Sequence, residues 1–108
     1  MKKVMLMMFA LMVAFNASAD AKKGQKYYLK YLRPHFDING QEFASQHLKV
    51  EWKRLFKKDS ARFIKEYTKK YPQSEEFLKS ETFQKIAPDV KDFTIKYAAD
   101  SGELASCN

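Results

Sequence analysis

The side chains best able to bind a metal or move a proton are two histidines, His35 and His47, the only ones in the chain. They stand twelve residues apart, so a metal site would need a further ligand such as Asp37 or Glu42. The sequence contains no HExxH motif and no Cys and His residues at zinc-binding spacing. We therefore expect structural or surface roles for both histidines, and no metal site.

Catalysis by an activated nucleophile has little support in the sequence. The G-x-S-x-G motif of many serine hydrolases is absent. Two neighbouring acids, Glu75 and Glu76, would point in different directions on a helix and so could not work as a pair. These observations predict a non-catalytic protein, with no catalytic residues and no cofactor.

Positive charge is the strongest chemical feature of the sequence. Twenty Lys and Arg residues stand against thirteen Asp and Glu, which gives a net charge of +7 at pH 7. Many basic residues recur three or four positions apart and would form stripes on helices. Such a stripe is either a solvated face that keeps the protein soluble or a surface that docks an acidic protein or an anionic surface. The residues that we predict to bind the partner are Lys53, Arg54, Lys57, Lys58, Lys65 and Lys69.

The first nineteen residues have the plan of a secretory signal peptide. Lys2 and Lys3 precede an apolar stretch at positions 4–15, and Ala17-Ser18-Ala19 is a small-x-small cleavage site. The apolar stretch is too short to span a bilayer. We therefore expect cleavage after Ala19, a periplasmic location and one domain over residues 20–108. Export argues against nucleic acid as the partner.

Cysteine use is minimal. Cys107 is the only cysteine, so no internal disulfide can form. It is the second residue from the end, in a stretch that we expect to fray. Its role remains open between an exposed thiol without a function, an intermolecular bridge as in a Cys107-linked dimer, and a redox partner that forms a mixed disulfide.

Helices must position these groups, because apolar residues recur at spacings of three and four and the alternation typical of strands does not persist. We expect a first helix over residues 22–33 that ends at Pro34, followed by a loop to Asn39. Asn39 and Glu42 have the spacing of a capping box, which predicts a short helix to about His47.

The rest of the chain follows the same pattern. A helical piece is expected over residues 49–57, and a longer helix begins at Ser60 and stops at Pro72. Ser80 is a candidate cap for a short turn, and Pro88 is expected in the first turn of the last helix. The sequence thus predicts an all-α domain, a small orthogonal assembly of about five to six short helices around an aromatic-rich interior.

Three segments of this chain resemble small class I c-type cytochromes. Gly24-Gln25-Lys26-Tyr27-Tyr28-Leu29-Lys30, followed by Tyr31-Leu32-Arg33-Pro34-His35, resembles the opening helix of that family, which runs into a C-x-x-C-H motif. Glu51-Trp52-Lys53-Arg54-Leu55-Phe56 and the segment from Pro88 to Ala99 resemble its later helices. The resemblance implies a cytochrome c-like fold for the domain after the signal peptide.

The haem-attachment motif of that family is missing. In the register that places His35 at the haem-binding histidine, Tyr31 and Pro34 stand where the two cysteines would be. No methionine follows residue 12, so the His/Met axial pair is missing as well. The resemblance therefore implies a haem-less domain that acts as a binding or accessory protein. The alternative is a periplasmic electron carrier that binds haem non-covalently through His35 and His47.

Overall fold

The computed structural model describes residues 19–105, and over that range it contains helices and connecting turns but no strand. The predicted all-α class is thereby confirmed. The predicted signal peptide, apart from its last residue, and Cys107 lie outside the described residues. None of the described helices combines the length and the apolar character needed to cross a bilayer.

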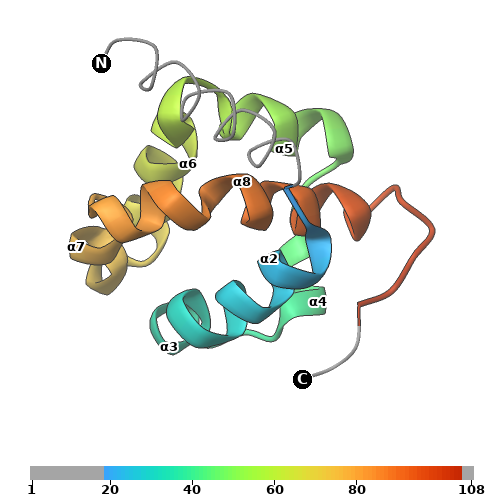
Figure 1. Cartoon of the computed structure of the whole chain (residues 1–108), viewed down its shortest axis with the longest axis horizontal. Helices are drawn as coiled ribbons and strands as arrows, with labels where there is room; N and C mark the ends of the chain where they lie inside the picture. The colour runs from blue at the N-terminus through green and yellow to red at the C-terminus, as the bar shows by residue number, and fades with distance from the viewer. Residues whose placement is uncertain (1–18, 106–108) are drawn as a thin grey trace, which may run out of the picture.

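The helices follow one another with short connections (Figure 1). They are α2 (Ala21–Tyr27), a π-helical turn (Tyr28–Leu32), α3 (Arg33–Phe36), α4 (Gly40–Ala44), α5 (Lys49–Leu55), α6 (Lys57–Lys70), a 3-10 turn (Pro72–Ser74), α7 (Glu75–Leu78) and α8 (Glu81–Lys96). Residues 21–36 run on as a single helical segment. Counted in this way, the described chain has six helices, within the predicted range.

The last helix, α8, runs through the middle of the molecule, with α2 and α3 on one side and α5 and α6 on the other (Figure 1). Its closest neighbour is α2. At their crossing a Cβ atom on Gly24 would lie 1.9 Å from the carbonyl oxygen of Asp89 and 2.8 Å from Cβ of Phe93. Glycine is therefore required for the two backbones to approach so closely.

The sequence predicted that the first helix ends at Pro34, and this prediction is wrong. The π-helical turn leads into α3, and Pro34 lies in the first turn of α3, where a backbone N–H is not needed. The segment ends instead at Asp37, whose φ of 59° and ψ of 34° are left-handed. His35 consequently lies on a helix and not in the expected loop.

Pro88 does not open the last helix either, because α8 begins seven residues earlier. The hydroxyl oxygen of Ser80 accepts a hydrogen bond from the Phe83 N–H and caps the whole helix. Pro88 is exposed inside it, while Ile86 and Val90 on either side are buried. Burial of this continuous apolar face offsets the roughly 3 kcal/mol that a proline costs within a helix.

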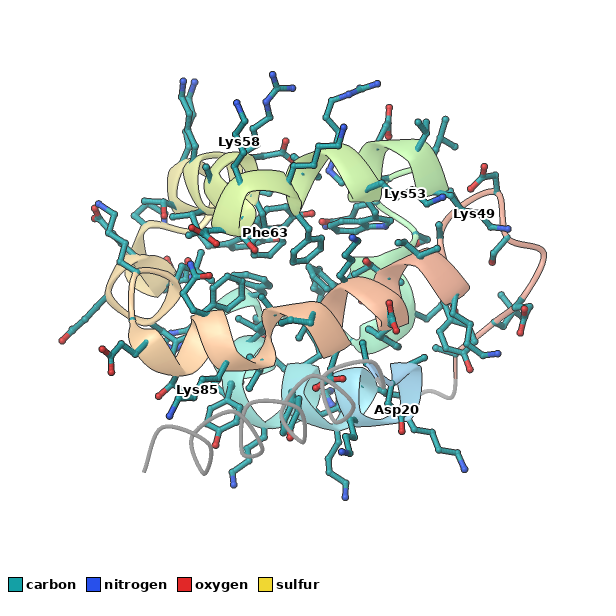
Figure 2. The ribbon with its side chains drawn as sticks, turned by 45° about the horizontal axis from the view of Figure 1, so that its top comes forward. Asp20, Lys49, Lys53, Lys58, Phe63 and Lys85 are labelled. Atoms are coloured by element: carbon teal, nitrogen blue, oxygen red, sulfur yellow. The ribbon has the colours of Figure 1, made fainter. Side chains whose placement is uncertain are left out.

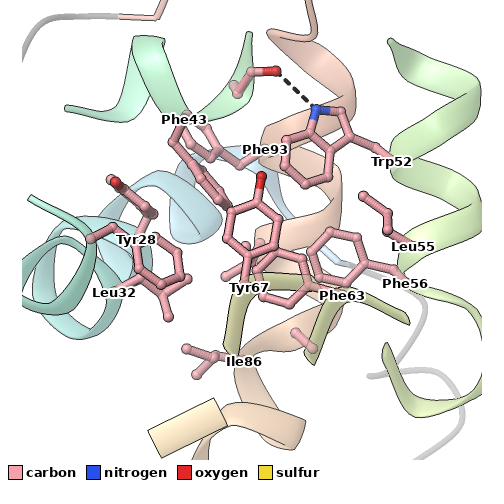
Figure 3. Packing of buried hydrophobic residues seen from close by; sticks show 14 of the residues in the cluster. Tyr28, Leu32, Phe43, Trp52, Leu55, Phe56, Phe63, Tyr67, Ile86 and Phe93 are labelled. Atoms are coloured by element: carbon pink, nitrogen blue, oxygen red, sulfur yellow. Dashed lines mark hydrogen bonds between the residues drawn. The ribbon is translucent and has the colours of Figure 1, made fainter. Parts of the chain in front are cut away.

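An aromatic cluster occupies the space between α8 and the other helices (Figure 3). Phe43, Trp52, Phe63 and Tyr67 are fully buried, with ring centroids 4.4–6.3 Å apart. The indole N–H of Trp52 donates to the carbonyl oxygen of Ala44 at 2.8 Å, so its only polar atom is satisfied. The aromatic-rich interior predicted from the sequence is therefore present.

Three helix boundaries predicted in the middle of the chain have different outcomes. The Asn39–Glu42 capping box is confirmed, since each side chain accepts the backbone N–H of the other residue. Ser60, by contrast, does not have the extended conformation of an N-cap. Lys58, Asp59 and Ser60 have φ values of 53°, 57° and 65°, and this left-handed turn changes the chain direction between α5 and the regular part of α6. The predicted stop before Pro72 is confirmed, because α6 ends at Lys70.

Candidate docking face on α5 and α6

The residues predicted to bind a partner gather along two neighbouring helices. Figure 2 shows nitrogen-tipped side chains, the labelled Lys58 among them, projecting outward from α5 and α6. Each of the predicted residues is exposed: Lys53, Arg54, Lys57, Lys58, Lys65 and Lys69. The structure thus leaves all of them accessible to a second molecule.

The sequence of α6 explains why its basic residues share one side. Arg62, Lys65 and Lys69 recur at spacings of three and four and therefore lie on the same face of the helix. Phe63 and Tyr67 lie on the opposite face and are fully buried. Burial of the two rings fixes the rotation of α6, and that rotation turns the basic stripe toward solvent.

A groove of about 650 Å³ lies between α5 and α6. Four cationic side chains line it: Arg54 from α5 and Arg62, Lys65 and Lys69 from α6. Leu55 adds an apolar surface to the lining. The groove therefore offers positive charge around a partly apolar depression.

Two further hollows adjoin the groove and share residues with it. One, of about 340 Å³, is lined by Lys57, Lys58 and Ala61 together with the same Arg54 and Arg62. The other, of about 420 Å³, shares Lys65 and Lys69 with the groove. Lys79 also lines the second of these hollows, but it is paired with Glu75. We call the other cations that line the three depressions the basic face: Arg54, Lys57, Lys58, Arg62, Lys65 and Lys69.

The basic face lacks one of the predicted residues and contains one that was not predicted. Lys53 is exposed on α5 but lines none of the three depressions. Arg62 lines two of them and was not predicted as a partner-binding residue. Its spacing from Lys65 and Lys69 was the available signal; its proximity to Arg54 required the tertiary structure.

The basic face has an excess of positive charge, since its six cations face the two carboxylates of the groove, Glu51 and Glu66. Within residues 19–105, none of its six cations takes part in a salt bridge. Two salt bridges lie in the groove itself, where His47 contacts Glu51 and Glu66. A third joins Lys79, at the second hollow, to Glu75. An excess of cations on one surface attracts an acidic partner over a distance set by the ionic strength.

The two carboxylates in the groove are held by His47. Its Nδ1 lies 3.2 Å from Oε1 of Glu51, and its Nε2 lies 2.7 Å from Oε2 of Glu66. Glu51 belongs to α5 and Glu66 to α6, so the side chain of His47 joins the two helices.

Glu51 is also part of the start of α5. Its carboxylate accepts the backbone N–H of Leu48 at 3.0 Å. This hydrogen bond, and secondly the one from His47, hold the pKa of Glu51 below its usual value. Arg54 of the basic face lowers the pKa of Glu51 further, so this carboxylate offsets part of the positive charge of that face.

Packing behind His47 keeps the ring in place. The ring of Trp52 lies edge-on to the imidazole, with centroids 4.9 Å apart. The backbone carbonyl of His47 accepts the N–H of Ala99, three residues beyond the end of α8, at 3.1 Å. The wall of the groove is thus anchored to the aromatic core and to the turn that follows the last helix.

His35, the second predicted haem ligand, lies at another place in the molecule. Its ring stacks on Phe77 with centroids 6.0 Å apart, and its carbonyl oxygen accepts a hydrogen bond from the Gln73 side chain. It lines a hollow of about 350 Å³ that has no residue in common with the groove beside His47. The structure does not bring His35 and His47 into one site.

Over residues 19–105, no group of three or more His, Cys, Asp or Glu side chains is arranged to hold a metal ion. Cys107 lies outside that range, so its predicted bridging role stays a prediction. No protein-family model, curated protein or solved structure shows a significant match to this chain.

Proposed function

We propose that the protein is an exported, non-catalytic binding or accessory protein that docks an acidic partner on its basic face. The observation that carries this proposal is the position of Arg54 and Arg62, which come from two helices and line both the groove and the hollow beside it. Each guanidinium group can bind a carboxylate with two parallel hydrogen bonds. Two such groups side by side suit a surface that carries several carboxylates.

The excess positive charge of the basic face should act mainly on the rate at which a partner binds. Like charges on one surface raise the rate of encounter with an oppositely charged partner more than they raise the final affinity. Both effects weaken with salt, because the screening length is about 8–10 Å at physiological ionic strength. Strong salt dependence is therefore expected of any complex formed here.

The experiment compares two double charge reversals that change the net charge equally. Arg54→Glu with Arg62→Glu alters the basic face, and Lys22→Glu with Lys26→Glu alters exposed residues of α2 on the other side of α8. Binding of a fluorescent ten-residue Asp/Glu peptide is followed by anisotropy at low and physiological salt. We expect the first variant to lose at least about tenfold in affinity and the second to lose much less.

Equal losses in the two variants would show that the peptide responds only to net charge and would contradict the proposal. Circular dichroism of both variants checks that neither is unfolded. A pull-down from periplasmic extract with the same pair of variants then asks whether a natural partner uses the same surface.

The cytochrome c-like character of the fold also stays a proposal. Its support is the crossing of the first and last described helices at Gly24, the two segments that carry most of the sequence resemblance. Haem binding through His35 and His47 has less support, because the two side chains line separate hollows and both ring nitrogens of His47 face carboxylates. Titration with haem tests this alternative, and a Soret band that both His→Ala variants abolish would restore it.

A further inference from the structure

The beginning of α2 is attached to α8 by a hydrogen bond between two residues that are far apart in the sequence. The backbone N–H of Asp20 donates to Oδ1 of Asp89 at 2.7 Å, across 69 positions of sequence. The side chain of Asp20 meanwhile accepts the N–H of Lys22 and caps α2. The same Asp89 has its backbone carbonyl against Gly24. Asp89 therefore holds the start of α2 through its side chain and the middle of α2 through its main chain.

Negative charge accumulates at this contact. Asp20, Asp89 and Asp92 come together where α2 meets α8. Burial raises the pKa of Asp92, and the neighbouring Asp89 and then Asp20 raise it further, while Lys91 acts in the opposite direction. A cation added beside these three carboxylates should therefore stabilise the folded protein.

The chain can supply this cation itself. Ala17-Ser18-Ala19 has the small-x-small pattern of a signal-peptidase site, and the nitrogen released by cleavage is the one that already lies 2.7 Å from Asp89. We propose that cleavage after Ala19 frees an α-ammonium group at Asp20 that pairs with Asp89, so that processing itself strengthens the contact between α2 and α8.

The reaction is hydrolysis of one peptide bond by a membrane signal peptidase. Water breaks the bond between Ala19 and Asp20, the removed peptide keeps the new carboxylate, and the Asp20 nitrogen takes up a proton. A neutral N–H donor thereby becomes an ammonium with three donors, and the attraction between opposite charges is added to a hydrogen bond that until then had only an ionised acceptor. A positive charge at the start of a helix is otherwise unfavourable, and the three carboxylates offset that effect.

The test compares two proteins that differ by one residue. The first is the exported protein, whose start at Asp20 is verified by intact mass. The second begins at Ala19 and is released from an N-terminal fusion by a site-specific protease, so that its ammonium is displaced from Asp89 by one residue. Both are made as wild type, as Asp89→Asn and as Glu76→Gln, an exposed carboxylate on α7 that serves as the control.

We expect the wild-type protein that begins at Asp20 to melt about 4–8 °C higher than the one that begins at Ala19, the shift that a single new interaction gives in a domain of this size. Asp89→Asn should remove most of that difference, and Glu76→Gln should preserve it. Equal melting temperatures in the wild-type pair would overturn the proposal. So would a difference that persists in Asp89→Asn, or an exported protein whose mass shows a start at another residue.

Discussion

His47 and Glu66 join the turn after α4 to helix α6, with 2.7 Å between Nε2 and Oε2. The two residues are nineteen positions apart. Because the groove of the basic face lies directly beside them, this pair helps to set the distance between the cations of α5 and those of α6.

Removing the His47–Glu66 pair should loosen the groove more than it lowers the overall stability. A double-mutant cycle with His47→Ala and Glu66→Ala should give a coupling free energy of about 0.5–1 kcal/mol, because the carboxylate is partly exposed. The cycle is measured by urea unfolding at pH 6. A coupling free energy close to zero would show that the contact does not join the two helices in solution.

Gly24→Ala should be one of the most damaging single substitutions in the protein. The added methyl group would overlap the carbonyl oxygen of Asp89, which is main chain and cannot move aside as a side chain could. We expect a loss of about 3 kcal/mol in the free energy of unfolding.

Gly102→Ala is the matched control for that substitution. Its φ of 77° disfavours alanine, but nothing lies within 4 Å of the added atom, so the loss should be about 1 kcal/mol. Denaturant unfolding of both variants gives the comparison. Similar losses would mean that the helices do not cross as closely as described.

Two buried tyrosines predict a loss of stability in alkali. Burial is the main reason that the pKa values of Tyr28 and Tyr67 lie above the usual value of 10. Above that pH the unfolded chain releases both protons while the folded chain keeps them, so the free energy of unfolding falls as the pH rises. The double variant Tyr28→Phe, Tyr67→Phe should lose less stability between pH 7 and pH 10.5 than the wild type.

The same variant should be less stable at pH 7, because each phenol donates a hydrogen bond, Tyr28 to the Ile38 carbonyl and Tyr67 to the Gln46 side chain. The expected loss is about 1 kcal/mol for each bond. Urea midpoints at the two pH values measure both effects. A wild type and variant that lose stability in parallel up to pH 10.5 would argue against the buried positions of the rings.

Asp92→Asn should stabilise the protein near neutral pH. The pKa of Asp92 is raised, chiefly by burial and next by Asp89, so the folded state favours the protonated acid and stability is lost as the pH rises through that pKa. Asparagine carries no charge at any pH, so the variant avoids this loss of stability. We expect a higher melting temperature for the variant at pH 7 and no difference at about pH 2.5, below the usual pKa of Asp.

Asp37→Asn is the control for Asp92→Asn, because Asp37 is exposed and asparagine accepts its left-handed conformation. The gain from Asp92→Asn should also be smaller in protein that begins at Asp20, where the α-ammonium adds a positive charge. A variant that melts below the wild type at pH 7 would contradict the predicted direction.

The sequence by itself determined the features that depend on near neighbours in the chain. Apolar spacing identified the all-α class and the buried faces that carry Trp52, Phe63 and Tyr67. The Asn39–Glu42 capping box and the stop before Pro72 were also readable, because a cap or a proline acts on residues within one turn. The basic stripe of α6 was visible for the same reason.

Only the tertiary structure decided the features that depend on contacts between distant residues. Pro34 and Pro88 both remain inside helical segments, although a proline tends to end a helix within one turn. A local adjustment of the backbone allows this at Pro34, and the burial of neighbouring residues allows it at Pro88. Arg54 and Arg62 line the same groove because the buried rings of α6 fix the rotation of that helix. Packing energy of this kind is summed over the whole core, so no short stretch of sequence contains it.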